Sequence, residues 1–397
     1  MLYLLLMNPV RNPYVPNAGA MPPVLPGRES LLDTFATAIA RVKIGRSAKS
    51  LLPYGLRGVG KTVLLRRFLK EARDAGYLTG LIEADEGTKF LPALADQLRR
   101  ILFQLDTPAK VHALAKRAMR VFKSFTIKAG LEGLSMSLGV DAERGFGDSG
   151  DIAIDLTALF AAIGEAARDQ ETAVLIAIDE VQYLDEREFS ALIKAIHQVT
   201  QEALPVLVVA TGLPQVLALA GDAKSYAERL FDFRSVGPLS KDDAREALIA
   251  PAANEGVVFE DDAANAVFDA TRGYPFFLQE WAYNAWNEAR GSSITLDDVR
   301  RGEAIAIPKL DDGFFAVRYN RCTPSEKRYL RAMAELGEGP FRTADVARKL
   351  GKENNRLGPT RDSLIKKGMI WSPEHGLIAF TVPLFDEFMR RKEPTFP

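Results

Sequence analysis

The chain has 397 residues, and at about 150 residues per domain this length predicts two to three domains. Its 51 Lys and Arg nearly balance its 52 Asp and Glu, which argues against a uniformly basic nucleic-acid coat and against an acidic disordered chain. With 47% hydrophobic and 26% charged residues, the chain is expected to bury a sizeable core. The single cysteine, Cys322, excludes an internal disulfide framework, and three histidines leave little material for a zinc site.

The first 26 residues are rich in Pro, Asn and Gly, which predicts an extended arm that lies over the protein as a strap. The apolar opening, Leu2–Met7, is too short to span a bilayer and lacks a basic flank. Together with the lone cysteine, this favours a cytoplasmic protein without a membrane partner.

Apolar strand patterns alternate with helical patterns along residues 27–238. The expected strands are Leu51–Leu52, Leu78–Ile82, Ala173–Ile178 and Val206–Ala210, and helices are expected from Arg28 to Gly45, from Thr62 through Leu69, and over 91–123, 152–167 and 186–202. Such alternation predicts an α/β core with a parallel sheet. Residues 123–151 are expected to form an insertion, with a hairpin at 125–140 and an acidic loop at 141–151.

Two further domains are expected after this core. Residues 239–322 are dominated by helical patterns and predict a helical lid. From Thr323 to the end the expected order is helix, helix, helix, hairpin, helix, which is that of a winged helix-turn-helix. The patterns along the chain therefore predict an α/β core with a parallel sheet, followed by a helical lid and a C-terminal winged helix-turn-helix.

The chemistry-bearing motif begins directly after the first expected strand. Residues 55–62 fit the pattern Gly-x-x-x-x-Gly-Lys-Thr at every fixed position and precede a helix. Glycines let consecutive backbone N–H groups point at phosphate oxygens, and the helix N-terminus adds partial positive charge. The α/β core is therefore predicted to have the P-loop NTPase fold. The predicted nucleotide-binding residues of this loop are Gly55, Arg57, Gly58, Val59, Gly60, Lys61, Thr62 and Val63. Among them, Lys61 is expected to contact the β- and γ-phosphates.

A second motif is the apolar strand that ends in Asp179 and Glu180, at the edge of the sheet where ligands of α/β proteins bind. We expect Thr62 and Asp179 to hold Mg²⁺, and Glu180 to act as the general base on the attacking water. In P-loop ATPases with an inserted strand, a polar residue after the next strand contacts the γ-phosphate or the water. Thr211 takes this position, although it could equally be a turn residue.

Two other classes of P-loop protein compete with an ATPase for these motifs. A GTPase would carry Asp-x-x-Gly where this chain has 179–182 as Asp-Glu-Val-Gln, and would carry Asn-Lys-x-Asp where 240–243 lacks the Asn. GTP specificity is rejected on this basis. A small-molecule P-loop kinase is less easily excluded, but the paired carboxylates at Asp179 and Glu180 favour water as acceptor.

With these motifs in this order, the chain resembles the AAA+ ATPases related to replication initiators, and the neighbouring archaeal-ATPase and STAND nucleotide switches. The resemblance implies that Gly27 and Arg28 belong to a box beside the adenine, and that Tyr274 and Pro275 belong to the lid turn at the nucleotide. It also implies that Arg229 is an arginine finger, acting in the same chain or from a neighbouring subunit; the alternative is a surface charge pair with Glu228.

The chain departs from that resemblance at two positions. Initiator-type members carry an arginine in the lid, whereas this chain has a Gly-x-Pro turn, Gly273-Tyr274-Pro275, with Arg272 beside it. This turn favours a resemblance to the STAND-like members. Thr211 replaces the more usual Asn, which is consistent with slow hydrolysis.

The C-terminal region carries the positive charge of the chain. Residues 323–397 hold 14 Lys and Arg against 10 Asp and Glu, a net of +4, and residues 348–367 hold seven basic residues against two acidic ones. Basic charge near a recognition helix pairs with phosphates, so double-stranded DNA is the expected partner of residues 348–367.

These observations lead to two function hypotheses. The first is a Mg·ATP-binding and hydrolysing switch that binds DNA through its winged helix. The second is a nucleotide-dependent signalling or regulatory protein whose winged helix contacts a protein and not DNA. A homo-oligomer is left open as a further assembly of the chain.

Overall fold

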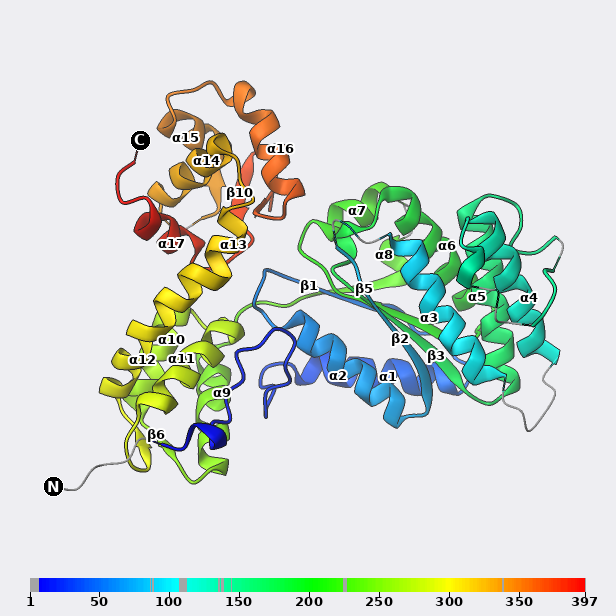
Figure 1. Ribbon diagram of the computed structural model, residues 1–397, viewed down its shortest axis with the longest axis horizontal. Helices are drawn as coiled ribbons and strands as arrows, with labels where there is room; N and C mark the ends of the chain where they lie inside the picture. Colours follow the sequence, from blue (N-terminus) through cyan, green and yellow to red (C-terminus); the bar gives the residue numbers. More distant parts are fainter. Residues whose placement is uncertain are drawn as a thin grey trace. The chain divides into compact units, whose positions relative to one another are not determined.

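The computed structural model describes residues 7–85, 87, 89–106, 113–134, 136, 139–143, 145–223, 227–337 and 339–396. These residues form two compact units (Figure 1). The sheet unit comprises Ser30–Tyr54 and Lys61–Ser235, and the helical unit comprises the described parts of Met1–Glu29, Gly55–Gly60 and Val236–Pro397. The segments expected as a lid and as a winged helix therefore fall within one unit, which also includes the backbone of the glycine-rich loop.

The sheet unit is built on parallel strands. They are β1 (Ser50–Tyr54), β2 (Tyr77–Glu83), β3 (Ala173–Asp179), β4 (Val206–Ala210) and β5 (Phe231–Ser235). Strands β2, β3 and β4 pair in that order, β1 pairs with β5, and a parallel bridge between Tyr54 and Gly212 joins β1 to the chain after β4. The predicted parallel α/β sheet is confirmed. Sequence patterns missed β5, because Asp232 and Arg234 interrupt its apolar residues.

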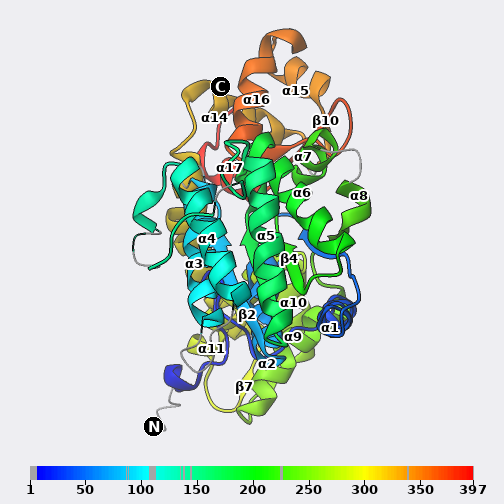
Figure 2. The same ribbon diagram turned by 90° about the vertical axis from the view of Figure 1, so that its right-hand side faces the viewer.

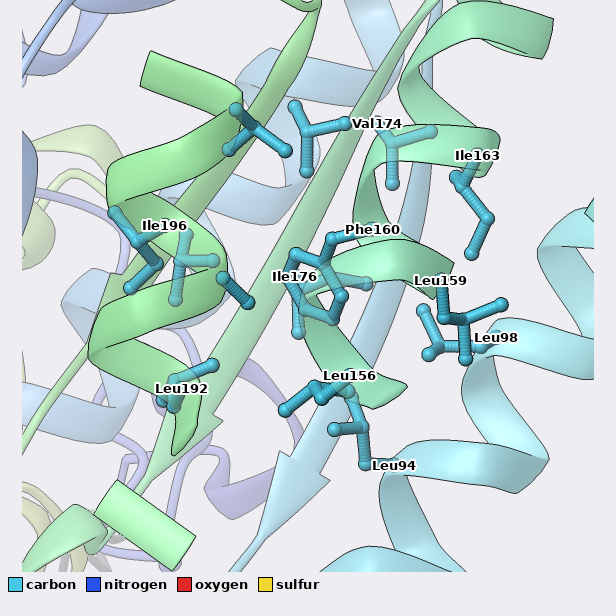
Figure 3. Packing of buried hydrophobic residues seen from close by; sticks show 14 of the residues in the cluster. Leu94, Leu98, Leu156, Leu159, Phe160, Ile163, Val174, Ile176, Leu192 and Ile196 are labelled. Atoms are coloured by element: carbon cyan, nitrogen blue, oxygen red, sulfur yellow. The ribbon is translucent and has the colours of Figure 1, made fainter. Parts of the chain in front are cut away.

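Helices cover both faces of this sheet. They are α1 (Glu29–Lys43), α2 (Lys61–Asp74), α3 (Phe90–Leu105), α4 (Ala113–Lys128), α5 (Ile152–Asp169), α6 (Glu186–Gln201), α7 (Val216–Ala223) and α8 (Ala227–Leu230), with 3-10 turns η2 (Glu132–Leu134) and η4 (Val181–Tyr183). Val174 and Ile176 of β3 pack with residues of α3, α5 and α6 (Figure 3). Leu175 and Ala177, which point to the opposite face, are equally buried. Double-sided burial explains why β3 is an unbroken apolar run.

The hairpin expected at 125–140 is wrong. Helix α4 continues to Lys128 and lies beside α5 (Figure 2), and the described residues between α4 and α5 include no strand. Val121, Phe122 and Phe125 are buried at helical spacing, so the period along this segment is that of a helix. In the following acidic loop, Glu143 forms ion pairs with Arg117 and with a second arginine of α4.

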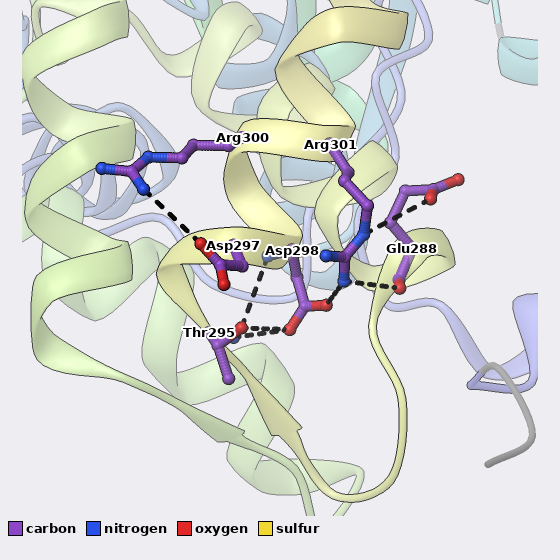
Figure 4. Close-up of polar contacts among 6 residues, drawn as sticks. All are labelled: Glu288, Thr295, Asp297, Asp298, Arg300 and Arg301. Carbon is purple, nitrogen blue, oxygen red and sulfur yellow. Dashed lines mark hydrogen bonds and ion pairs between the residues drawn. The ribbon is translucent and has the colours of Figure 1, made fainter.

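The first part of the helical unit, after β5, consists mainly of helices. They are α9 (Lys241–Asn254), α10 (Asp261–Thr271), α11 (Pro275–Glu288), α12 (Leu296–Lys309), the π-helical η5 (Leu310–Phe315) and α13 (Ala316–Tyr319), with the short parallel pair β6 (Val258–Phe259) and β7 (Ser293–Ile294). Thr295 caps α12 through Asp298, and Arg301 binds both Asp298 and the Glu288 carbonyl (Figure 4). No helix among the described residues has the length and apolar character needed to cross a bilayer.

The N-terminal arm is a packed part of the helical unit rather than a loose strap. After the 3-10 turn η1 (Pro9–Arg11), Tyr14 is 1% exposed and its hydroxyl donates to the Leu248 carbonyl of α9 at 2.5 Å. Earlier in the arm, the Met7 N–H donates to the Ala289 carbonyl at 2.9 Å. These contacts order a Pro-rich segment that has no regular structure to satisfy its own backbone.

The C-terminal part of the helical unit follows the predicted order of elements. It contains α14 (Pro324–Glu335), α15 (Thr343–Lys349), η6 (Asn354–Leu357), α16 (Gly358–Lys366) and α17 (Phe385–Lys392), with an antiparallel sheet in the order β8 (Phe341–Arg342), β10 (Leu377–Phe380), β9 (Ile370–Trp371). The short strand β8 was not predicted, because two residues carry no periodicity.

A buried carboxylate connects α14 to α16. Glu326 is 3% exposed and accepts hydrogen bonds from Ser363 at 2.6 Å, Lys367 at 2.7 Å and the backbone N–H of Thr323 at 2.7 Å. Burial alone would raise the pKa of Glu326, but these donors outweigh it and lower the pKa to about 2.

Replacing Glu326 with Gln is expected to destabilise this region at neutral pH by roughly 1–3 kcal/mol. Because the folded-state pKa is depressed, the stabilisation is present above the unfolded pKa and is lost as pH falls from about 5 towards 2. Hydrogen exchange at the amides of α14 measures the effect at pH 7 and pH 3. Glu353→Gln, which removes an exposed ion pair with Arg356, is the control. An equal loss for Glu326→Gln at both pH values would contradict the assignment.

Candidate nucleotide site

The glycine-rich loop connects β1 to α2 and needs glycine at several positions. Gly58 and Gly60 have φ values of 81° and 92°, in the left-handed region that disfavours side chains. At Gly55 a Cβ atom would lie 2.0 Å from the Val236 carbonyl oxygen. The loop conformation therefore depends on these three glycines, of which the motif specifies Gly55 and Gly60.

Replacing Gly55 with Ala is expected to displace the loop, because the added methyl group overlaps a backbone oxygen that cannot rotate away. We expect ATP affinity to fall by about 10-fold or more, since the N–H groups of the loop lose their alignment. Gly45→Ala is the control: Gly45 lies in the left-handed region, unlike Gly55, but nothing lies within 4 Å of its Cβ position. Calorimetric titration with ATP compares the two variants, and equal affinities would contradict the assignment.

The first residues of α2 carry the polar side chains of the motif. Lys61 is 5% exposed, and the Thr62 hydroxyl donates to Asp179 Oδ2 at 2.6 Å. Asp179 is the last residue of β3 and is 4% exposed. The structure thus brings together Thr62 and Asp179, which are 117 residues apart in sequence.

This pair of oxygen donors fits Mg²⁺, which prefers hard oxygen ligands and takes few of them from protein, leaving the rest to water and phosphate. The described residues contain no cluster of three or more His, Cys, Asp or Glu side chains that could enclose a metal ion by themselves. A cation at Thr62 and Asp179 would therefore depend on phosphate oxygens to complete its coordination.

The residues that follow β3 and β4 contact each other. The Thr211 hydroxyl donates to Asp179 Oδ1, and Thr211 is fully buried. The Val181 N–H donates to the Thr211 carbonyl at 2.9 Å. Thr211 therefore orients Asp179, and its predicted contact with phosphate or water stays a prediction.

Glu180 directly follows Asp179 and has a left-handed backbone, with φ 54° and ψ 42°. The amide of Gln182 donates to its carboxylate at 2.5 Å. Sequence reasoning missed Gln182, because its role depends on contacts with two different loops.

In the helical unit, Arg28 contacts the glycine-rich loop from another direction. Its guanidinium donates to the Val59 carbonyl at 3.3 Å and to the Gly237 carbonyl at 2.6 Å. Burial lowers the pKa of Arg28, against the opposing effect of Asp243 and Glu29. Preceding it, Gly27 has φ 71° and lies against Asp243. Their predicted place beside adenine stays a prediction.

Two further backbone contacts of the loop were not predicted. The Phe276 N–H donates to the Gly58 carbonyl at 3.1 Å, and the Arg57 N–H donates to the Thr381 carbonyl at 3.0 Å. Tyr274 is the N-cap residue of α11 and Pro275 is its first residue, immediately before Phe276. Their predicted place at the nucleotide stays a prediction. Burial raises the pKa of the Tyr274 hydroxyl.

The remaining candidate, Arg229, lies exposed on the short helix α8. Ser225 and Tyr226, which the resemblance places in the same segment, lie outside the described residues. Its role as an arginine finger stays a prediction.

Two families match the sequence. Residues 24–209 match a family described as AAA ATPase domain, and residues 312–389 match a family described as a domain of unknown function. No curated protein sequence matches the chain significantly.

Solved structures with a similar fold cover nearly the whole chain. A Walker-type ATPase of Pyrococcus abyssi is 18% identical over 92% of this chain and 96% of its own, with a TM-score of 0.60. The ORC1 protein of Aeropyrum pernix, solved with DNA, is 17% identical over 97% of this chain and 96% of its own, with a TM-score of 0.47. A RuvB variant of Thermotoga maritima is 16% identical over 89% and 92%, with a TM-score of 0.46.

The Pyrococcus structure supports the fold, and the match over 24–209 includes both the glycine-rich loop and the acidic end of β3. Residues 24–209 therefore belong to the AAA ATPase domain family, and the chain shares the fold of the Walker-type ATPase.

Proposed function

We propose that the chain is a Mg·ATP-dependent switch that binds double-stranded DNA through a C-terminal winged helix. The nucleotide half of the proposal rests on one observation: the Thr62 hydroxyl and the Asp179 carboxylate meet at 2.6 Å at the start of α2, beside the buried Lys61. Lys61 would bind the β- and γ-phosphates, Thr62 and Asp179 would hold the cation, and Glu180 would accept the proton of the attacking water.

The DNA half rests on the elements and the charge of residues 323–397. Three helices, α14 to α16, precede the β9–β10 hairpin, and the segment carries a net charge of +4. Helices two and three of such a module enter or flank the major groove, and its basic side chains neutralise phosphates.

The ion pairs of this segment bear directly on its charge. Five of the seven basic residues of 348–367 pair with an acidic side chain; they are Arg348, Lys349, Arg356, Arg361 and Lys367. This pairing favours the second candidate, a protein partner. However, the side chains of Arg348 and Arg356 are 79% and 76% exposed, and exposed pairs contribute only about 0–1 kcal/mol. Phosphates can therefore replace the acidic partners at little cost.

Binding of double-stranded DNA across a salt series tests the proposal. We expect affinity to fall steeply with salt, and the double variant Arg348→Ala, Arg356→Ala to reduce the slope of log K against log salt by about 2. Arg300→Ala is the matched control, because Arg300 forms the same exposed i, i+3 pair with Asp297 on α12 (Figure 4). No binding at low salt, or equal slopes for the three proteins, would favour a protein partner.

The proposed finger residue has its own test. If Arg229 acts from a neighbouring subunit, ATPase activity per chain rises with protein concentration, and Arg229→Ala abolishes the rise. Activity that stays strictly proportional to concentration would contradict a finger supplied by a second copy.

A further inference from the structure

We propose that Gln182 is a positioning residue that holds the Glu180 carboxylate in place for the attack of water on ATP. The inference rests on the proposed role of Glu180 as the general base. Gln182 lies two positions after Glu180, in the 3-10 turn η4 that follows β3.

Both polar atoms of the Gln182 side-chain amide form hydrogen bonds. Its amide nitrogen Nε2 donates to Glu180 Oε2 at 2.5 Å, and its Oε1 accepts the Leu213 N–H at 2.9 Å. A glutamine has a donor group and an acceptor group on one rigid amide plane, so fixing Oε1 also fixes the direction of Nε2. Gln182 thereby links the carboxylate after β3 to the backbone after β4.

The anchor at Leu213 is itself well held. Leu213 is fully buried, and the preceding Gly212 donates its N–H to the Pro53 carbonyl of β1 at 3.3 Å. A Cβ atom at Gly212 would lie 3.0 Å from Gln182 Oε1, so the amide is packed tightly against this loop. The position of Gln182 Nε2 is therefore fixed by contacts with the chain after β4, which in turn is hydrogen-bonded to β1.

Glu180 needs such a partner. Its left-handed backbone is sparsely populated for a residue with a side chain and sets the direction of the Cα–Cβ bond, but the carboxylate still rotates about three side-chain bonds. An amide donor selects one of these orientations and fixes the direction of the carboxylate oxygen that it contacts. A carboxylate has about four acceptor sites, so the amide contact is compatible with a hydrogen bond to water.

The test compares steady-state ATPase kinetics of the full chain with ATP affinity measured by calorimetry. For Gln182→Ala we expect kcat to fall by about 10- to 100-fold while ATP affinity stays within about 2-fold, because the base loses alignment but the phosphate contacts remain. Gln198→Ala is the matched control: Gln198 makes the same amide-to-carboxylate contact, with Glu202, on the exposed end of α6. Its kcat should equal that of the natural chain.

A second variant separates positioning from packing. Gln182→Glu keeps the size and the acceptor for Leu213, but replaces the amide donor with a negative charge beside Glu180. The added charge repels the Glu180 carboxylate, so kcat should fall at least as far as in Gln182→Ala although the volume of the side chain is kept. A residue that only fills space would tolerate this change of equal size and keep its kcat.

The outcomes distinguish the inference from the proposed role of Glu180. If Glu180→Gln turns over ATP normally, the base assignment fails whatever Gln182 does. If Glu180→Gln is inactive but Gln182→Ala or Gln182→Glu keeps its full kcat, the inference about Gln182 alone is overturned. In the Glu180→Gln background, removal of Gln182 should lower the residual rate no further.

Discussion

Replacing Lys61 with Ala is expected to weaken ATP binding by about 30-fold or more. Lys61 begins α2 and is 5% exposed, so its ammonium group would meet the phosphates with little competition from water. Removing one partner of such a desolvated charge contact typically costs about 2–5 kcal/mol, and each 1.4 kcal/mol is a factor of ten in affinity.

Calorimetric titration of ATP with Mg²⁺ into the full-length variant measures this loss. Lys70→Ala is the control, because Lys70 lies on the same helix and its 64% exposed side chain pairs with Asp74. If Lys61→Ala binds ATP as tightly as Lys70→Ala, the loop does not hold the triphosphate as proposed.

Replacing Glu180 with Gln is expected to reduce ATP turnover by about 10²- to 10⁴-fold, because a glutamine amide cannot take the proton of the attacking water. ATP affinity should stay within a few-fold of that of the natural chain, since the phosphate and cation contacts belong to other residues. The variant should therefore retain ATP and accumulate in the bound state.

A single-turnover assay with radiolabelled ATP follows both quantities in one sample. Glu186→Gln, at the exposed start of α6, removes a nearby carboxylate that has no place in the proposed chemistry. Normal turnover in Glu180→Gln would refute the assignment of the base, and loss of binding would show that Glu180 serves the site in another way.

The sequence predicts the parts of this molecule whose structure is decided locally. The run of apolar residues ending at Asp179 predicts β3, because a strand buried on both faces has no polar position along its length. The spacing of Gly55, Gly60 and Lys61 likewise predicts a loop that only glycines can form. Where periodicity was short or mixed, as in β5, β8 and the end of α4, prediction failed.

Contacts between distant segments were beyond reach from the sequence. Thr211 bonds to a residue 32 positions away, Gln182 to one 31 positions away, and Arg28 to one 209 positions away. In the sequence, each of these residues is an ordinary polar residue, because its partner becomes a neighbour only when the chain has folded. The motifs therefore predicted which residues bind phosphate and cation, whereas the contacts of Asp179 with Thr211 and of Glu180 with Gln182 emerged only from the structure.

Titration of Mg·ATP into the folded, full-length chain tests the central claim most directly. The account predicts saturable uptake of one nucleotide per chain, lost in Lys61→Ala and weakened when Mg²⁺ is chelated, since Thr62 and Asp179 meet where the cation would bind. A folded sample supplied with Mg²⁺ that takes up no adenine nucleotide would contradict the account, together with the roles given to Glu180 and Gln182.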